Sequence, residues 1–321
     1  MDNTDRELLS ILQADFPFVV KPYAAVAEKL GIGEDEVIRR IIVFKADGIV
    51  RQISPVMDAR RLGYSTTLVA AKIDINSMDN AAEVFSNHPR ISHAYQRSHE
   101  YNLWYTLAQP PNTDISEEIS RIAGKIYADS SFSLPSTRLY KLGAFFGKKG
   151  SGFKTQQPGG KLSRVAELSA EDIIVINNSQ YDLPLDPTPF SAMAGQAGLD
   201  EEVFLDRCTS LVERGIMRRY GASINHRRAG YTANAMVCWA VEPALSDTLG
   251  EKLASYREVS HCYERRTNSL WRHNIFAMIH GEKENICRDV ADEVTSIFGI
   301  EDYIMLLSTR EVKKARVRYT L

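Results

Sequence analysis

The sequence is poor in the features that mark secreted, membrane-spanning and nucleic-acid-coating proteins. Its 321 residues include four cysteines and no C-x-x-C pair, which argues against a disulfide scaffold and favours free thiols in a reducing compartment. No stretch reaches the ~20 apolar residues of a membrane span, and the N-terminus has no apolar signal core. The net charge of −2 excludes a chain that is basic throughout. We therefore expect a cytoplasmic protein in which any anion-binding site is local.

An internal repeat organises the chain. Short strings recur in the same order: Gly48-Ile49-Val50-Arg51 returns as Gly215-Ile216-Met217-Arg218, and Ser136-Thr137-Arg138 returns as Ser308-Thr309-Arg310. The offset grows from 167 residues in the first pair to 172 in the second. A segment rich in glycine and lysine lies between the copies and has the composition of a flexible linker. We expect the two copies to pack as an intramolecular pseudo-dimer; a homodimer of the whole chain stays open.

Each copy is predicted to contain the same two domains. Apolar spacing predicts three helices and a strand, typical of a winged helix-turn-helix, over 4–13, 23–30, 34–46 and 49–53. The rest of the first copy alternates strand and helix in a ferredoxin-like β-α-β-β-α-β order, over 65–74, 77–87, 91–97, 102–108, 116–128 and 132–139. The second copy repeats this order near 231–241, 244–255, 258–265, 273–280, 283–297 and 302–309. The predicted fold class is α+β, a tandem duplication of these two domains.

The repeat also sets the predicted domain boundaries. The first copy comprises a winged helix-turn-helix at 1–60 and a ferredoxin-like domain at 61–147. A flexible linker at 148–169 leads to the second winged helix-turn-helix at 170–227 and the second ferredoxin-like domain at 228–321.

A basic stretch joins the two domains of the second copy. Residues 218–230 contain four arginines, among them Arg218 and Arg219, together with His226. Arginine presents a planar fork to carboxylates and phosphates, and histidine can transfer a proton near neutral pH. This composition favours a site for a polyanion, with a merely solvated loop as the alternative.

Strand alternation gathers further polar side chains in the second ferredoxin-like domain. Side chains two residues apart share a face, so His261, Tyr263 and Arg265 are predicted to face one way and Cys262 the other. On the next strand Phe276, Met278 and His280 share a face, and His273 lies at its mouth. Such a face indicates a ligand surface, with ordinary surface polar residues as the alternative; His280 could simply turn the chain.

These strings resemble a known family. A winged helix-turn-helix followed by a ferredoxin-like domain is similar to the Lrp/AsnC transcription regulators. Several strings more closely resemble the siroheme decarboxylases, which belong to alternative haem and haem d1 biosynthesis. They are the duplicated Asp-Phe-Pro…Pro-Tyr opening, Arg218-Arg219-Tyr220-Gly221-Ala222, His261-Cys262-Tyr263-Glu264-Arg265, Trp271-Arg272-His273-Asn274-Ile275-Phe276 and the Ser-Thr-Arg endings. In that family two homologous subunits pair, and this sequence resembles both subunits fused.

The resemblance implies a carboxy-lyase that removes CO2 from two acetate side chains of siroheme and gives didecarboxysiroheme. The expected cofactor set is none beyond the iron of the substrate, with no other metal. Protonating the macrocycle beside an acetate provides the electron sink, so a general acid is required. We expect His261 to be that acid, with His226 and His273 in reserve; any of these histidines could instead bind the iron. The expected substrate-binding residues are Arg219, Arg265, Arg218, Arg272, Tyr263, His93 and Arg97.

The first copy is poorer in these residues. Arg51-Gln52-Ile53-Ser54 replaces the second copy's Arg-Arg-Tyr-Gly string, and Ala59 occupies the position of His226. We expect the first half to support the site, contributing His93 or Arg97.

Two other functions compete with the enzyme. A haem-responsive Lrp/AsnC-type regulator would need basic recognition helices, but the third helices open with Glu34-Asp35-Glu36 and Asp200-Glu201-Glu202, which DNA would repel. A small-molecule sensing module would leave the arginine-rich stretch unexplained. We therefore expect siroheme as the partner, and neither DNA nor a membrane.

Overall fold

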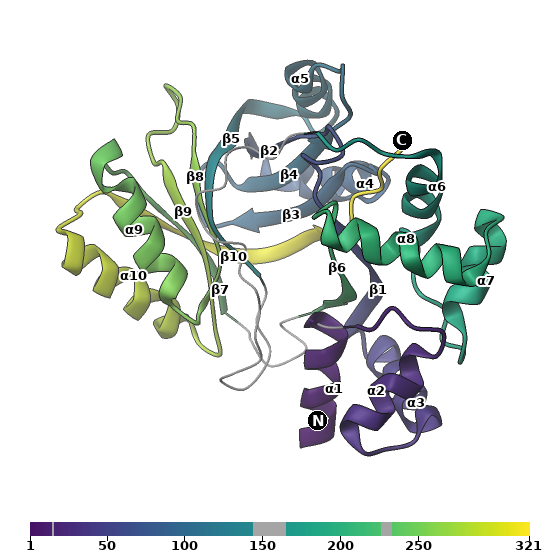
Figure 1. Cartoon of the computed structure of the whole chain (residues 1–321). Helices are drawn as coiled ribbons and strands as arrows, with labels where there is room; N and C mark the ends of the chain where they lie inside the picture. The colour runs from purple at the N-terminus through teal and green to yellow at the C-terminus, as the bar shows by residue number, and fades with distance from the viewer. Residues whose placement is uncertain (15, 144–164, 226–232) are drawn as a thin grey trace.

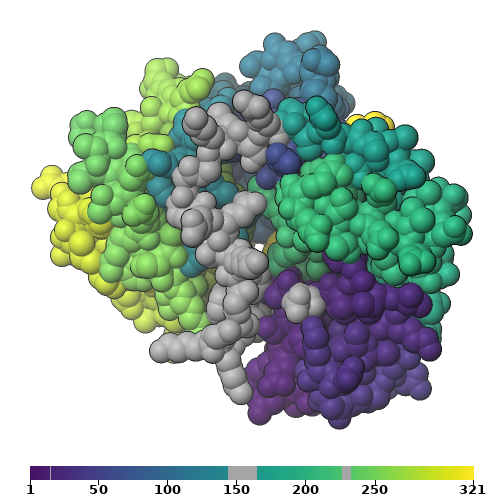
Figure 2. All heavy atoms as spheres, viewed as in Figure 1, coloured from purple at the N-terminus to yellow at the C-terminus, as the bar shows by residue number. Residues whose placement is uncertain are grey.

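The computed structural model describes residues 1–14, 16–143, 165–225 and 233–321, and it separates the chain into a pair of winged domains and a sheet domain. The helices of both winged domains lie together on one side, and the strands of both copies form the other side (Figure 1). In the space-filling view the purple first winged domain and the teal-green second one contact each other directly (Figure 2).

Each winged domain contributes three helices and one strand. In the first copy these are α1 (Asn3–Ala14), α2 (Pro22–Leu30), α3 (Glu34–Ala46) and β1 (Val50–Met57). In the second copy they are α6 (Ala170–Ser179), α7 (Pro189–Ala197), α8 (Glu201–Glu213) and β6 (Met217–Ile224). Strands β1 and β6 pair antiparallel with each other, so that Val56 lies opposite Arg219. The two winged domains also share one apolar core, in which Phe16 packs against Phe190 and Tyr220.

Each sheet unit contributes four strands and two longer helices. The first unit contains β2 (Ser65–Ile73), a short 3-10 turn η1 (Ile75–Ser77), α4 (Met78–Ser86), β3 (Ile91–Arg97), β4 (Leu103–Gln109), α5 (Ile115–Lys125) and β5 (Ala128–Leu142). The second unit contains β7 (Ala233–Trp239), α9 (Pro243–Ser255), β8 (Val259–Arg265), β9 (Ile275–Gly281), α10 (Glu284–Phe298) and β10 (Tyr303–Lys314).

The last strand of each unit closes both sheets into one barrel. The strand order is β10-β3-β4-β2-β5-β8-β9-β7, and the ends of this order also pair. Strand β5 pairs first with β2 of its own unit and then with β8 of the other. Strand β10 does the same with β7 and then β3. Closure removes the unpaired edges that an open sheet would expose.

Reciprocal lysine contacts also join the halves. Lys141, at the end of β5, donates to the carbonyl oxygen of Tyr256 just after α9, at 2.6 Å. Lys313, at the end of β10, donates to the carbonyl oxygens of Phe85 at 2.6 Å and His88 at 2.7 Å, at the end of α4. A cation at the C-terminus of a helix is favourable because the last carbonyl groups carry partial negative charge.

Three apolar cores stabilise the sheet domain. Helices α4 and α5 cover the outer face of the first sheet, and α9 and α10 cover that of the second (Figure 1). The third core fills the barrel between the sheets and includes Trp104, Phe132, Trp271 and Phe276. Part of the inner face of the barrel is therefore occupied by this apolar core.

The predicted α+β duplication and the order of its elements are confirmed. Two strands are longer than predicted because the second half of each pairs with the other copy: β5 spans Ala128–Leu142 rather than 132–139, and β10 spans Tyr303–Lys314 rather than 302–309. Most of the predicted linker lies outside the described residues. Within them, no helix is long and apolar enough to cross a membrane.

Candidate active site

Equivalent side chains of the two copies face the barrel interior. His93, Tyr95 and Arg97 on β3 correspond to His261, Tyr263 and Arg265 on β8. The Arg97 guanidinium lies over the Tyr95 ring at 5.4 Å, and the Arg265 guanidinium lies over the Tyr263 ring at 4.9 Å. The repeat has therefore placed one His-Tyr-Arg set on each wall.

Backbone carbonyl groups hold the two arginines in place. Arg97 donates to the carbonyl oxygen of Leu306 and the hydroxyl of Ser308, at 2.8 and 3.0 Å. Arg265 donates to the carbonyl oxygen of Leu134 at 2.8 Å. Burial lowers the pKa of each guanidinium to about 10, so both stay cationic at neutral pH.

A β-bulge precedes each histidine. The β8–β9 register shifts between Val259 and His261, and the β3–β4 register shifts in the same way before His93. A bulge re-aims the side chains around it, which lets Ser260 turn toward His261 although the two are adjacent in sequence. The Ser260 hydroxyl lies 2.7 Å from His261 Nδ1, and the Ser92 hydroxyl lies 2.9 Å from His93 Nδ1.

The surroundings of the two histidines differ. Lys314 lies directly opposite His93 on β10, where the other copy has Leu142 opposite His261. Conversely, the Ser260 hydroxyl also lies 2.7 Å from Nε2 of His280, whose equivalent in the first copy is Ala108. A lysine thus stands beside one histidine and a second histidine beside the other.

Further cations approach from the winged domains and the C-terminal segment. A pocket of about 440 Å³ is lined by Lys45, Gly48, Val50, Arg51, Gln52, Ser223, Lys314, Ala315 and Arg316. Its residues come from both winged domains and the end of the chain. The pocket adjoins the histidines, since the positive charges of Arg51, Lys314 and Arg316 all act on the ring of His93. Burial lowers the pKa of Lys314 to about 8, so this amine still carries a proton at neutral pH.

The β6 arginines lie on the same side of the barrel. Arg219 donates to the carbonyl oxygen of Gln13 at the end of α1, and its charge acts on His261. Gly221 allows this close approach, because a Cβ atom there would lie 2.6 Å from the carbonyl oxygen of Leu12. Arg218 instead pairs with Asp58 at 3.0 Å, although its charge still reaches Tyr263.

The histidines are poor proton acceptors without a ligand. Burial, followed by the charge of His280, lowers the pKa of His261 to about 3. Burial, followed by the charge of Lys314, lowers that of His280 to about 4. Protein surrounds the ring of His93 while water still reaches it, as expected for a side chain that lines a hollow, and its pKa is also lowered. A ligand that brings negative charge would raise these values and load the histidines with protons.

The opposite end of the barrel is closed by aromatic side chains. Trp104 lies 5.0 Å from Trp271, and Tyr101 lies 4.7 Å from Phe132, measured between ring centres. His273 belongs to this end, where its Nε2 lies 3.0 Å from a carboxylate oxygen of Asp302. The structure therefore does not bring His273 together with His261.

Of the other predicted site residues, some lie near His261 and some do not. Arg272 is exposed and also pairs with Asp302, away from the histidines. His226 lies outside the described residues. Among the predicted positions, the described structure brings His261 near Tyr263, Arg219 and His93. Arg97 lies close enough for its charge to act on His280, Arg265 lies beyond Tyr263 and also over Phe276, and the charge of Arg218 reaches Tyr263.

Sequence reasoning missed Ser260, Lys314, Arg316 and Arg51 as site residues. Strict alternation assigns Ser260 to the face opposite His261, and the bulge is not visible in the sequence. Lys314 and Arg316 lie at the chain end beyond the last predicted strand, and the pairing of β10 with β3 brings them to the site. The positive charges of Lys314 and Arg316 were the one sequence feature that could have indicated a role in binding an anionic ligand. No group of three or more potential metal ligands occurs among the described residues.

Known proteins resemble the chain over nearly its whole length. A family model described as AsnC-like ligand binding domain matches residues 61–141 and 228–313, and the Siroheme decarboxylase NirDL-like HTH domain matches 5–51 and 172–218. The siroheme decarboxylase of Hydrogenobacter thermophilus is 35% identical over 320 residues, covering 99% of this chain and 96% of that one.

A solved structure and a shorter relative agree with this match. The crystal structure of the siroheme decarboxylase NirDL in co-complex with an iron-uroporphyrin III analogue matches with a TM-score of 0.72 and 31% identity, covering 99% of this chain and 95% of that one. The siroheme decarboxylase beta subunit of Methanosarcina barkeri is 38% identical over 147 residues, 46% of this chain and 97% of that subunit. One half of this chain thus matches a whole subunit there, and the chain belongs to the siroheme decarboxylase family as a fused, single-chain member.

Proposed function

We propose that this chain removes CO2 from two acetate side chains of siroheme and gives didecarboxysiroheme. The observation that carries the proposal is the pair of equivalent histidines, His93 and His261, at one cation-lined end of a barrel. Two equivalent groups suit a substrate that reacts at two positions. The related NirDL structure, which holds an iron-uroporphyrin III analogue, supports a tetrapyrrole as the ligand.

The cations around the histidines would hold the substrate by its carboxylates. Siroheme carries eight carboxylates, and arginine binds a carboxylate through two parallel hydrogen bonds. Arg219 and Arg265 are the principal candidates, with Lys314 and Arg316 added by the structure. Arg51 lines the same pocket but already pairs with Glu311 at 2.5 Å. Fixing the carboxylates fixes the rotation of the macrocycle, and so determines which acetates lie beside the histidines.

His261 is proposed as the general acid for one acetate. Ser260 engages its Nδ1, which leaves Nε2 as the nitrogen available to the substrate. Protonation of the macrocycle beside the acetate allows the macrocycle to accept the electron pair of the breaking C–C bond as CO2 leaves. Transfer of that hydrogen to the exocyclic carbon completes the methyl group, so each CO2 lost consumes one proton.

His93 is proposed as the acid for the second acetate. The sequence predicts only a supporting role for the first half, but the structure gives His93 the same strand position, bulge and serine partner as His261. His273 is less suitable because it pairs with Asp302 at the other end. We expect no metal or cofactor beyond the iron of the substrate.

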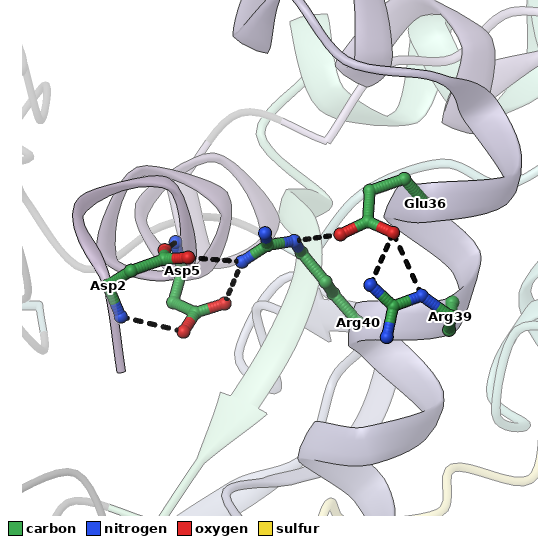
Figure 3. A network of polar contacts seen from close by, with 5 residues as sticks. All are labelled: Asp2, Asp5, Glu36, Arg39 and Arg40. Carbon is green, nitrogen blue, oxygen red and sulfur yellow. Dashed lines mark hydrogen bonds and ion pairs between the residues drawn. The ribbon is translucent and has the colours of Figure 1, made fainter.

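A DNA-binding role is disfavoured by the third helices of the winged domains. Arg40 of α3 pairs with Asp2, Asp5 and Glu36, and Arg39 pairs with Glu36 (Figure 3). The other basic residues of these helices are also paired with acids: Lys45 with Asp182 and, in α8, Arg207 with Glu171. A recognition helix must present its cations to phosphates, and these cations are already neutralised.

Anaerobic incubation of the purified protein with siroheme tests the proposal. The expected result is a product that has lost two CO2 by mass. Unchanged siroheme, or salt-sensitive binding to duplex DNA at ~100 mM salt without turnover, would favour the regulator instead.

A further inference from the structure

One hydroxyl group connects two histidines in the second half of the site. Ser260 Oγ lies 2.7 Å from His261 Nδ1 and 2.7 Å from His280 Nε2. It also lies 3.4 Å from the carbonyl oxygen of Met278, a longer contact. Ser260 is only 3% exposed, whereas His261 and His280 are partly exposed. The serine is therefore held inside the wall while both rings reach the hollow.

A serine hydroxyl has one hydrogen to donate, which constrains its two partners. If Ser260 donates to His261 Nδ1, the neutral ring of His261 must carry its hydrogen on Nε2, and His280 Nε2 then donates to Ser260. If Ser260 donates to His280 instead, His261 Nδ1 carries the hydrogen and its Nε2 is bare. A histidine with a bare Nε2 can accept a proton or bind iron, but it cannot act as the acid through that nitrogen.

We propose that His280, acting through Ser260, fixes His261 in the form that carries its hydrogen on Nε2. As Nε2 gives this proton to the substrate, Nδ1 takes the hydrogen of Ser260, and a protonated His280 replaces that hydrogen, so that His280 ends neutral. Ser260 and His280 are positioning residues in this arrangement, and the inference rests on His261 being the acid of the proposed function. The carboxylates of a bound substrate favour a proton on His280, whose Nε2 contacts Ser260. A protonated His280 can only donate to Ser260, which gives the proposed direction.

The first half provides a built-in comparison. Ser92 contacts His93 Nδ1 at 2.9 Å, but Ala108 stands where the second half has His280. The Ala108 side chain has no polar atom that could form a hydrogen bond with the Ser92 hydroxyl. The variant His280→Ala therefore gives the second half the arrangement that the first half already has.

The test combines histidine spectroscopy with kinetics. Long-range ¹H–¹⁵N spectra of ¹⁵N-histidine-labelled protein report which ring nitrogen carries hydrogen, and His261→Ala identifies the His261 signals by their loss. We expect the wild-type ring to carry hydrogen on Nε2. In Ser260→Ala and His280→Ala both forms should be populated, with kcat about 10- to 100-fold lower and KM unchanged. Ser260→Thr keeps the hydroxyl and should restore both readouts, and Ser92→Ala should leave the His261 signals unchanged.

Different outcomes distinguish this inference from the proposed function. Hydrogen on Nδ1 of wild-type His261, or unchanged His261 signals in both Ser260→Ala and His280→Ala, overturns the positioning role while leaving His261 as the acid. A lower kcat without a change in the His261 signals also overturns the positioning role, because a loss of packing alone would lower kcat in the same way. Wild-type turnover in His261→Ala instead removes the acid assignment on which the inference rests.

Discussion

The two halves have diverged on both faces of their sheets. Behind the first sheet, Glu118 of α5 is buried among His88, Arg90 and Arg121, with contacts of 2.7–2.8 Å. The equivalent position in α10 is Val290, which packs in an apolar core. The first half thus has a buried ion cluster behind its sheet, where the second half has an apolar side chain in its core.

On the inner face the difference has another form. Both histidines have a serine partner, but His93 also has Lys314 opposite it, whereas the serine of His261 also contacts His280. The two proposed acids thus occupy shared positions, whereas the groups beside them differ between the halves.

Loss of the acid gives the largest expected effect. His261→Ala should keep siroheme binding but lower the formation of the doubly decarboxylated product by roughly 10²–10⁴-fold, the range for general acid catalysis. This product is followed by mass spectrometry, and binding by the shift of the siroheme absorption. His273→Ala is the matched control, since His273 is held by Asp302 at the closed end. A loss in His273→Ala with normal turnover in His261→Ala would transfer the role to His273.

Removing a carboxylate-binding arginine comes next. Arg219→Ala or Arg265→Ala should weaken siroheme binding by about 1.5–3 kcal/mol, because a charged hydrogen bond is lost. This corresponds to roughly 10- to 150-fold in Kd. Arg272→Ala should leave Kd unchanged, since Arg272 pairs with Asp302 away from the histidines. Titration at fixed ionic strength checks this, and equal losses in all three variants would argue for a general charge effect.

The ion cluster of the first half should contribute to stability in a pH-dependent way. Hydrogen bonds from Arg121 are the largest cause that lowers the pKa of Glu118, to about 2. A carboxylate with a lowered pKa stabilises the fold fully above its unfolded value of about 4.3, and this stability is lost as the pH falls toward 2. Glu118→Gln should therefore cost about 1–3 kcal/mol in urea unfolding at pH 7.

The same experiment at lower pH provides the internal check. The gap between the wild type and Glu118→Gln should narrow as the pH falls from about 4.3 toward 2. Glu117→Gln, an exposed neighbour on α5, is the matched control and should cost much less than Glu118→Gln at pH 7. A gap that does not change with pH would mean that packing, rather than charge, is responsible.

The lysine contacts between the halves should have the smallest effect. Lys313→Met removes hydrogen bonds to Phe85 and His88, and Lys141→Met removes one to Tyr256. Each half-buried contact contributes about 1 kcal/mol to the free energy of unfolding, with the larger loss for Lys313. Lys125→Met, at an exposed position, serves as the control in urea unfolding. Equal stability of all three variants would contradict a joining role.

The sequence allowed the duplication and much of the inner face to be predicted. Strings such as Ser-His-x-Tyr recur in the same order in both copies, and alternation then assigns His261, Tyr263 and Arg265 to one face. Local periodicity cannot show which copy a strand will pair with, so the exchange of β5 and β10 between the sheets was not predicted. The contributions of Lys314 and Arg316 to the site depend on that exchange.

Bulges and buried ion pairs also escape sequence reasoning. Ser260 joins the inner face only because the β8 register shifts beside it. His88 lies in a loop, as the proline after it predicts, but the sequence does not show that it is buried against Glu118 of α5. Such contacts depend on tertiary packing, which no short pattern encodes.

The most direct measurement of the central claim is the structure of the product that each histidine variant releases. If His261 and His93 each serve one acetate, then His261→Ala and His93→Ala should accumulate two different compounds, each lacking one CO2 and retaining a different acetate. Mass spectrometry counts the CO2 lost, and NMR of the iron-free products locates the remaining acetate. Complete loss of both CO2 in either variant, or the same compound from both, would contradict a two-acid site built from the two halves.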